Sequence, residues 1–185
     1  LSAWEAALAC DPTSAFGGIL VCNKAIDVET ANAIDHIFYE VVIAPEYLDG
    51  ALEVLKKKKN RTIIELHTFA TSNTLRRTVV GGTLVQENDL FPIESEEVKL
   101  VTTMAIPEDK KPDLTFAIKC VKHLKSNAIS IVKNQQMIGS GVGQTSRVDA
   151  LKQAITKAKS MGFNLKGSIL ASDAFFPFGD TVELA

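Results

Sequence analysis

The chain has 185 residues, of which 46% are hydrophobic, and a formal net charge of −2 at pH 7. This length and apolar content allow one full core, or two small lobes that share an interface. The weak negative charge gives no electrostatic argument for a nucleic-acid partner, and the basic run 56–59 is better explained as a solvated helix end. Because no apolar run approaches the roughly 18 residues of a membrane span, we expect no membrane partner either.

Cysteine usage argues against disulfides and against a structural metal. Cys10, Cys22 and Cys120 are odd in number and far apart, so their spacing fits neither a disulfide framework nor a zinc site. Each lies among apolar residues, as reduced thiols in a protein core do. We therefore expect a cytoplasmic protein that binds no metal.

Helical spacing and short apolar runs alternate through the first third of the chain. Helices are predicted at 2–10, 27–38 and 46–58, and strands at 17–23, 39–45 and 61–67. Asp27 is the expected N-cap of the second helix. Because strands that alternate with helices usually pair in parallel through crossover connections, this part predicts a parallel α/β sheet. The strands at 17–23 and 39–45 are expected to be buried.

The pattern changes after residue 68. A strand pair broken at Gly81–Gly82 is predicted at 74–89 and a loop at 90–97. A further strand follows at 97–104, and a charged, proline-bounded linker at 105–112. Next come an amphipathic helix at 113–125 and a β-hairpin at 128–141. A second helix is predicted at 146–162, and a final buried strand with its loop at 167–180. We expect a lobe boundary between residues 68 and 112.

The stretch "SNAISIVKNQQMIGSGVGQTSRVDA" joins the predicted hairpin to a helix through three glycines, in 139–143. Ser146 is the expected N-cap, Asp149 occupies the capping-box position, and Arg147 is the first helical residue. Glycine permits unusual turns and close approach of a ligand, while a helix N-terminus with an arginine suits an anionic or carbonyl group. The alternative is a bulged hairpin and a capped helix, with Arg147 paired to an acid at the surface. The G-x-G-x-G spacing is not the dinucleotide fingerprint, which disfavours NAD.

Two loops are further candidates. "DPTSAFGGI", residues 11–19, leads into a strand, and such loops often hold ligands in α/β sheets, although a plain turn is an equal alternative. "SDAFFPFGD", residues 172–180, has three phenylalanines that cannot all face one core. They could form an aromatic floor for a flat ligand with Asp173 and Asp180 at its edges, or pack beneath a loop.

Two isolated features carry weaker signals. Glu40 begins an apolar strand, where a carboxylate must be either solvated at the strand end or directed into a site. Lys122–His123 has the composition of an acid/base pair, but it lies at the polar edge of an amphipathic helix. A solvated or locally bonded histidine is the better interpretation there.

Six stretches together resemble successive blocks of the AICAR transformylase family. They are "ACDPTSAFGGI", "EVVIAPEY", "LRRTVVGGTLVQE", "DLTFAIKCVKHLKSNAI", "IGSGVGQTSRVDA" and "SDAFFPFGD". Each block alone would be a weak signal. Their order is that of the family, and they extend from about Ala9 to Asp180, so the combination is specific.

The resemblance implies a function in purine biosynthesis. The family transfers a formyl group from 10-formyltetrahydrofolate to the amine of AICAR, the aminoimidazole carboxamide ribonucleotide, giving FAICAR. It is a bifunctional enzyme with a separate IMP cyclohydrolase domain. The implied fold is α/β, with two cytidine-deaminase-like lobes and mixed sheets flanked by helices. The implied assembly is a cytosolic homodimer with sites at the subunit interface, and the implied ligands are AICAR and folate.

Residue roles follow from the resemblance position by position. Contacts to AICAR are implied for Gly17, Glu40, Asn127, Arg147 and Phe175, and contacts to folate for Val148 and Asp180. Glu40 would lie on the ribose side, where some relatives have aspartate. On this basis the hairpin and the capped helix would hold an amide and a guanidinium over the nucleotide, and the glycines would let the base lie close to the backbone.

The departures from the family pattern also matter. The lysine–histidine pair of the family lies in a K-H-x-x-P segment that these 185 residues do not contain, and Lys122–His123 lies in the wrong block. Both chain ends have the composition of interrupted helices, so we expect an internal part of the domain that is inactive alone and holds no catalytic residue. Two alternatives stay open. One is a catalytically empty nucleotide-binding module, and the other is a zinc deaminase-like hydrolase, whose H-x-E and P-C-x-x-C motifs are absent.

Overall fold

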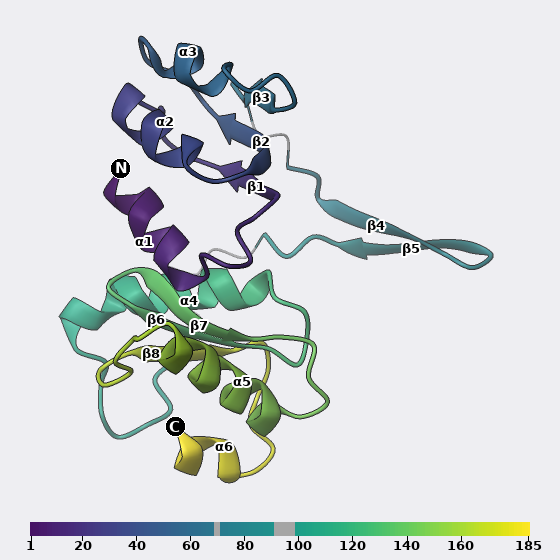
Figure 1. The fold of residues 1–185 in the computed structure, drawn as a ribbon. Coiled ribbons are helices and arrows are strands. Elements are labelled where there is room, and N and C mark those ends of the chain that lie inside the picture. Colours follow the sequence, from purple (N-terminus) through teal and green to yellow (C-terminus); the bar gives the residue numbers. More distant parts are fainter. Residues whose placement is uncertain (69–70, 91–98) are drawn as a thin grey trace. The chain divides into compact units, whose positions relative to one another are not determined.

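The computed structural model describes residues 1–68, 71–90 and 99–185. The fold is α/β, with parallel and antiparallel sheets flanked by helices, as the sequence predicted. The described residues form two compact units (Figure 1). The first contains Leu1 and residues 13–90, and the second contains residues 2–12 and 99–185. The lobe boundary expected between residues 68 and 112 stays a prediction.

The first unit contains a three-stranded parallel sheet. Its strands follow the order β1-β2-β3 and comprise Gly18–Val21, Tyr39–Ala44 and Thr62–Glu65. Helices α2 (Val28–Asp35) and α3 (Ala51–Leu55) lie in the two connections, which confirms the predicted crossover arrangement. Asp27 is the N-cap of α2, because its Oδ1 accepts a hydrogen bond from the Thr30 amide at 2.7 Å.

Among the described residues of this unit, helices cover only one face of the sheet. Val42 is completely buried on the covered face, whereas Ile19 and Val21 on β1 are 65% and 59% exposed. Two right-handed crossovers in the same direction place both helices on one side. The expectation that β1 is fully buried is therefore wrong for this unit.

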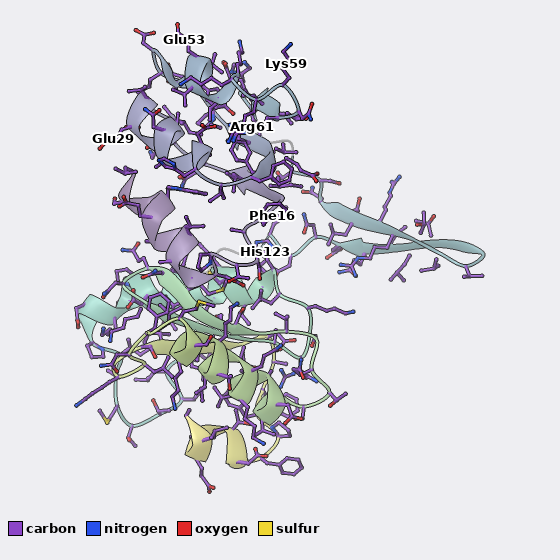
Figure 2. The ribbon with its side chains drawn as sticks, viewed as in Figure 1. Phe16, Glu29, Glu53, Lys59, Arg61 and His123 are labelled. Atoms are coloured by element: carbon purple, nitrogen blue, oxygen red, sulfur yellow. The ribbon has the colours of Figure 1, made fainter. Side chains whose placement is uncertain are left out.

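Helix α3 is shorter than predicted for a local reason. The predicted helix 46–58 begins only at Ala51, because Gly50 has a φ of 83° and interrupts helical geometry. Nearby, the Arg61 side chain pairs with Asp35 and is only 2% exposed. Its guanidinium carbon lies 4.1 Å from the centre of the Tyr39 ring, so Arg61, labelled in Figure 2, ties the start of β3 to α2 and β2.

Strands β4 (Thr74–Val79) and β5 (Gly82–Glu87) form the predicted antiparallel pair. The turn lies at Val80–Gly81, with Gly81 at a φ of 80°. Every residue of both strands is exposed. The hairpin is consequently a projecting arm of its unit (Figure 1).

The second unit contains an antiparallel sheet in the order β7-β6-β8. Its strands β6, β7 and β8 comprise Ile129–Lys133, Gln136–Gly141 and Ile169–Ser172. Its helices are α1 (Ser2–Cys10), η1 (Glu108–Lys110), α4 (Lys111–Lys122), α5 (Arg147–Ser160) and α6 (Asp180–Leu184). These elements confirm the predicted helices 2–10, 113–125 and 146–162 and the predicted hairpin, with shifts of a few residues at their ends.

Two apolar clusters hold this unit together on opposite faces of the sheet. Ile129 and Ile131 of β6 pack with Leu151 and Ala154 of α5. Val132 points to the other face, where the cluster includes residues of α4. Alternate residues of β6 thus serve two cores, and the sheet lies between α4 and α5 (Figure 1).

One predicted strand is wrong. Residues 99–104 form no strand, and Val101 and Met104 are 91% and 80% exposed. Their apolar pattern has no neighbouring strand within the described residues with which to pair. The other two residues of this predicted strand, 97–98, and residues 91–97 of the predicted loop lie outside the described residues.

The described residues can also be compared with the needs of a membrane-spanning helix, a metal site and a disulfide. In the described part of the chain, no helix is long and apolar enough to cross a bilayer. The same residues include no group of three or more His, Cys, Asp or Glu side chains that could hold a metal ion. The three cysteines are free, and burial raises the pKa of each thiol above its ordinary value.

Candidate functional site

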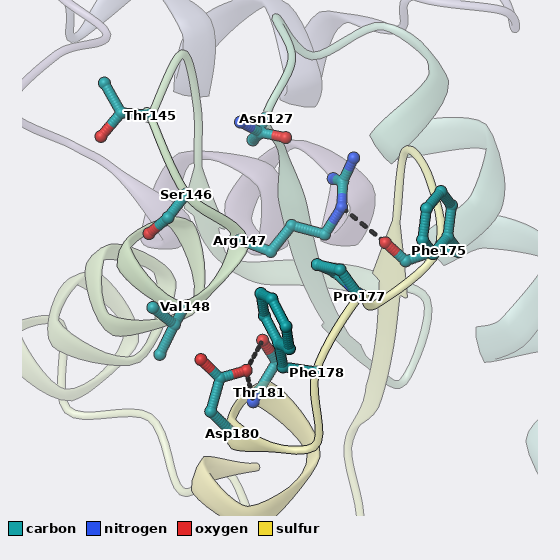
Figure 3. A pocket seen from close by; sticks show the side chains of 10 residues that line it. All are labelled: Asn127, Thr145, Ser146, Arg147, Val148, Phe175, Pro177, Phe178, Asp180 and Thr181. Carbon is teal, nitrogen blue, oxygen red and sulfur yellow. Dashed lines mark hydrogen bonds between the residues drawn. The ribbon is translucent and has the colours of Figure 1, made fainter.

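A pocket in the second unit lies between the start of α5 and the loop that follows β8 (Figure 3). Ten residues line it: Asn127, Thr145, Ser146, Arg147, Val148, Phe175, Pro177, Phe178, Asp180 and Thr181. Three chain segments that are distant in sequence therefore meet here.

Five of the seven predicted ligand-contacting residues line this pocket. They are Asn127, Arg147, Val148, Phe175 and Asp180. The other two, Gly17 and Glu40, belong to the first unit. The structure thus brings together the predicted residues of the second unit, while their contacts to ligands stay predictions.

Helix α5 begins as the sequence predicted. Ser146 is its N-cap, and the Ser146 Oγ accepts a hydrogen bond from the Asp149 amide at 3.1 Å. The same hydroxyl donates to Asp149 Oδ2 at 2.7 Å. This cap fixes the first turn of the helix, and Arg147 is the first residue of that turn.

Arg147 is held by three acceptors from the last residue of β8 and the loop that follows it. Its Nε donates to the Phe175 carbonyl at 2.8 Å, and its Nη1 donates to Asp173 Oδ1 at 2.6 Å and to Ser172 Oγ at 3.3 Å. Arg147 therefore pairs with an acid, as in the alternative. The pair is only 13% and 16% exposed, however, and it forms at the pocket wall. Nη2 makes no hydrogen bond with the described residues, so it can still donate to a ligand.

Asn127 lies opposite Arg147 in the same pocket. Its Nδ2 donates to the Gln144 carbonyl at 2.9 Å, and the two backbones exchange hydrogen bonds of 3.3 Å. With Nδ2 committed, Oδ1 remains as an acceptor, and Figure 3 shows this oxygen on the side facing Arg147. The pocket therefore presents an acceptor on Asn127 and a donor on Arg147.

The glycines before α5 serve packing more than ligand approach. Gly139 and Gly141 lie within β7, not in a loop. A Cβ atom at these positions would lie 2.5 Å from the Ala154 carbonyl oxygen and 1.8 Å from that of Ala150, respectively. Both glycines thus allow β7 to lie directly against α5, which corrects the expectation that they expose backbone to the base. Gly143, with a φ of 63°, is the glycine of this stretch that a turn requires.

The phenylalanines after β8 divide as predicted. Phe176 packs against the apolar cluster beneath α5, whereas Phe175 and Phe178 are 79% and 73% exposed. The last two line the pocket with Pro177. Asp180 begins α6, and its Oδ1 accepts the Thr181 amide at 2.7 Å. An apolar wall with a carboxylate at its end therefore faces the start of α5.

Asp173 is the residue whose importance the sequence did not reveal. The sequence suggested only a polar edge, but its carboxylate accepts hydrogen bonds from Arg147, from the Ala128 amide at 2.8 Å and from the Ser126 hydroxyl. Burial raises the pKa of Asp173, but these hydrogen bonds and the Arg147 charge outweigh it and leave the pKa below its ordinary value. Asp173 is therefore an anion at neutral pH.

The remaining predicted positions are not among the residues that line this pocket. Gly17 has a φ of +74° and donates its amide to the Phe38 carbonyl at 2.9 Å. Glu40 is exposed on β2 next to the buried Tyr39. His123 is the exposed C-cap residue of α4 (Figure 2), which confirms that Lys122–His123 is a helix end open to solvent.

Comparisons with known proteins agree with the family resemblance. The family model described as AICARFT/IMPCHase bienzyme matches residues 1–157. The bifunctional purine biosynthesis protein PurH of Bacteroides thetaiotaomicron is 51% identical over 185 residues, which cover 100% of this chain and 36% of that protein. The PurH proteins of Chloroflexus aurantiacus and Aquifex aeolicus are 44% and 47% identical, over 99% and 94% of this chain and 36% and 34% of their own lengths. The chain thus spans about a third of the length of these curated relatives.

Proposed function

Because this chain belongs to the AICARFT/IMPCHase bienzyme family, we propose that it is the central part of an AICAR transformylase domain. In the full-length protein, this domain transfers the formyl group of 10-formyltetrahydrofolate to AICAR and so produces FAICAR. The observation that carries the proposal is the pairing of Asn127 and Arg147 across one pocket.

This pairing matches the carboxamide of AICAR. A primary carboxamide has an N–H donor next to a carbonyl acceptor. Asn127 Oδ1 is available to accept from the N–H group, and Nη2 of Arg147 is available to donate to the carbonyl. The proposed contacts would fix the carboxamide in the plane that the reaction requires.

Orientation matters because the amine of AICAR is a weak nucleophile. Its lone pair is delocalised into the ring and the carboxamide, so attack on a formyl carbon needs a fixed geometry and a managed proton. We assign the orienting role to Asn127 and Arg147. The acid/base role would belong to the lysine and histidine of a K-H-x-x-P segment, which these 185 residues do not contain.

The folate would lie beside the same pocket. Val148 follows Arg147 on the first turn of α5, and Asp180 lies at the start of α6. We propose that these two residues contact the folate, while the exposed ring of Phe175 contacts AICAR. Gly17 and Glu40 would also contact AICAR, with Glu40 on the ribose side.

Other features of the family belong to the same proposal. We propose cytidine-deaminase-like lobes, a homodimer with its sites at the subunit interface, and a cytoplasmic location. The relatives are bifunctional, so the full-length protein would also carry IMP cyclohydrolase activity in a separate domain. The 185 residues alone would bind ligands weakly and would not catalyse formyl transfer.

The competing function is a nucleotide-binding module without catalysis. The two are distinguished by mixing the full-length protein with AICAR and 10-formyltetrahydrofolate and following tetrahydrofolate by absorbance. We expect turnover that depends on both substrates, and turnover by the 185-residue chain that is at least 100-fold lower. Full-length protein that binds AICAR without turnover would support the module instead.

A further inference from the structure

We propose that Asp173 is a positioning residue of this site, whose carboxylate holds Arg147 and the segment that carries Asn127 in a fixed relation to each other. The identity of the nucleotide rests on the proposed function. The arrangement itself depends only on the contacts of Asp173 in the second unit.

The carboxylate joins three segments of the chain. Oδ1 accepts from Arg147 Nη1 at 2.6 Å, at the start of α5, and from the Ala128 amide at 2.8 Å, before β6. Oδ2 accepts from the Ser126 hydroxyl. The Asp173 amide also donates to the Ala128 carbonyl at 3.3 Å. One side chain at the end of β8 therefore connects the two elements that supply Asn127 and Arg147.

Asn127 is fixed on both sides by these contacts. Its neighbours Ser126 and Ala128 each donate to Asp173, while its own side chain and backbone bond to Gln144. The peptide between the two anchored residues has little freedom to move. The position of Asn127 Oδ1 therefore depends on Asp173, although the two side chains share no hydrogen bond in the described structure.

Arg147 benefits in a different way. An unrestrained arginine side chain has many rotamers, and ordering it on ligand binding costs conformational entropy. Asp173 and the Phe175 carbonyl already select one rotamer. Since Nε and Nη1 are engaged, Nη2 is the donor left toward the pocket. Asp173 thus orders Arg147 before the nucleotide arrives.

The chemistry of the three donors explains why a carboxylate suits this position. A hydroxyl, a backbone amide and a guanidinium converge on it, and an ionised carboxylate only accepts hydrogen bonds. Asparagine has nearly the same shape but no charge. Asp173→Asn therefore removes the ionic attraction to Arg147 with little change in volume.

A double-mutant cycle in the full-length protein tests the inference. We expect Asp173→Asn to lower kcat/KM for AICAR about tenfold or more. In the Arg147→Ala background the same substitution should lower it several-fold less, because the part of its effect that passes through Arg147 is already lost. Equal effects in both backgrounds would overturn the inference, since a residue with a purely structural role would act independently of Arg147.

The matched control is Lys157→Gln, which removes a different ion pair of α5. Lys157 pairs with Asp11, with 2.6 Å between Lys157 Nζ and Asp11 Oδ2, and the pair is 31% exposed on each side. Lys157 lies ten residues beyond Arg147, about 15 Å along the helix. We expect kcat/KM within about twofold of wild type for this control, and a melting temperature similar to that of Asp173→Asn.

A second readout needs no ligand. The chain has four arginines, so ¹⁵N-arginine labelling of the 185-residue chain gives few side-chain signals. We expect the Arg147 Nε–H to exchange with water at least tenfold faster in Asp173→Asn than in wild type or Lys157→Gln. Unchanged exchange would contradict the inference. Failure of the wild-type enzyme to use AICAR would refute the proposed function, and this exchange measurement would still decide the role of Asp173.

Discussion

The guanidinium of Arg147 and the carboxylate of Asp173 meet at 2.6 Å although the two residues are 26 positions apart in the sequence. Arg147 begins α5, and Asp173 follows β8. The contact therefore joins the helix start that carries Arg147 and Val148 to the loop that carries the pocket phenylalanines. The Arg147 and Asp173 side chains are only 13% and 16% exposed, so solvent screens their attraction little and the pair can hold the Arg147 side chain in place.

Arg147→Ala should impair formyl transfer strongly in the full-length protein. Loss of a charged hydrogen-bond donor at a reacting group costs about 2–4 kcal/mol of transition-state stabilisation. We expect a fall in kcat/KM for AICAR of about 30-fold to 1,000-fold. Steady-state kinetics with AICAR as the varied substrate measures it.

Arg147→Lys is the matched variant. It keeps the positive charge but lacks the planar fork that contacts Phe175 and Asp173 together. We expect a kcat/KM for AICAR that lies between the values of the wild type and the alanine variant. A wild-type kcat/KM in Arg147→Ala would show that Arg147 does not belong to the site.

The stability contributed by Asp173 should depend on pH. Burial raises the pKa of Asp173, but the hydrogen bonds from Ser126, Ala128 and Arg147, together with the Arg147 charge, lower it by a larger amount. The folded-state pKa therefore lies below the unfolded one. Such a group contributes its full stability above the unfolded pKa, which is about 4, and loses it as pH falls through the folded pKa.

Urea denaturation of the wild type and Asp173→Asn at pH 7 and near pH 3 checks this sign. The wild type should be the more stable protein at pH 7, and the difference should shrink at acidic pH. A difference that grows as the pH falls would contradict the assigned direction.

Gly141→Ala should destabilise the second unit. A Cβ atom there would lie 1.8 Å from the Ala150 carbonyl oxygen, so β7 and α5 would have to separate. Overpacking of this kind typically costs about 1–3 kcal/mol, and backbone contact leaves little room for relief. Gly82→Ala is the control, because a Cβ atom at Gly82 would meet no other part of the described chain within 4 Å. Equal free energies of unfolding for the two variants would refute this account of the glycine.

His123→Gln should leave formyl transfer within about threefold of wild type. His123 is exposed at the end of α4 and does not line the pocket, and exposed substitutions away from a site usually have small effects. The assay is kcat/KM for both substrates, with the melting temperature as a control for folding. A loss of 100-fold or more in a folded variant would make Lys122–His123 a catalytic pair after all.

Local signals were sufficient for much of the fold. Asp27 and Ser146 each cap a helix through contacts three residues away, and such contacts are encoded in a few adjacent residues. The crossover arrangement of the first unit and the hairpin of the second follow from apolar periodicity in the same way. The resemblance to a family then selected five residues that share one pocket.

Long-range relationships could not be predicted from local patterns. The partner of Arg147 depends on how β8 pairs with β6, and the need for Gly141 depends on how closely α5 approaches β7. The exposed face of β1 depends on which side of the sheet the helices cover. Residues 99–104 have an apolar pattern typical of a strand, but a strand also needs a neighbour, and the sequence does not specify one.

The most direct test of the central claim is a crystal structure of the full-length protein with AICAR bound. The account predicts the carboxamide within about 3.2 Å of both Asn127 Oδ1 and a nitrogen of Arg147, with the Phe175 ring against the nucleotide. A nucleotide bound elsewhere, with the Asn127–Arg147 pocket free of ligand, would contradict it.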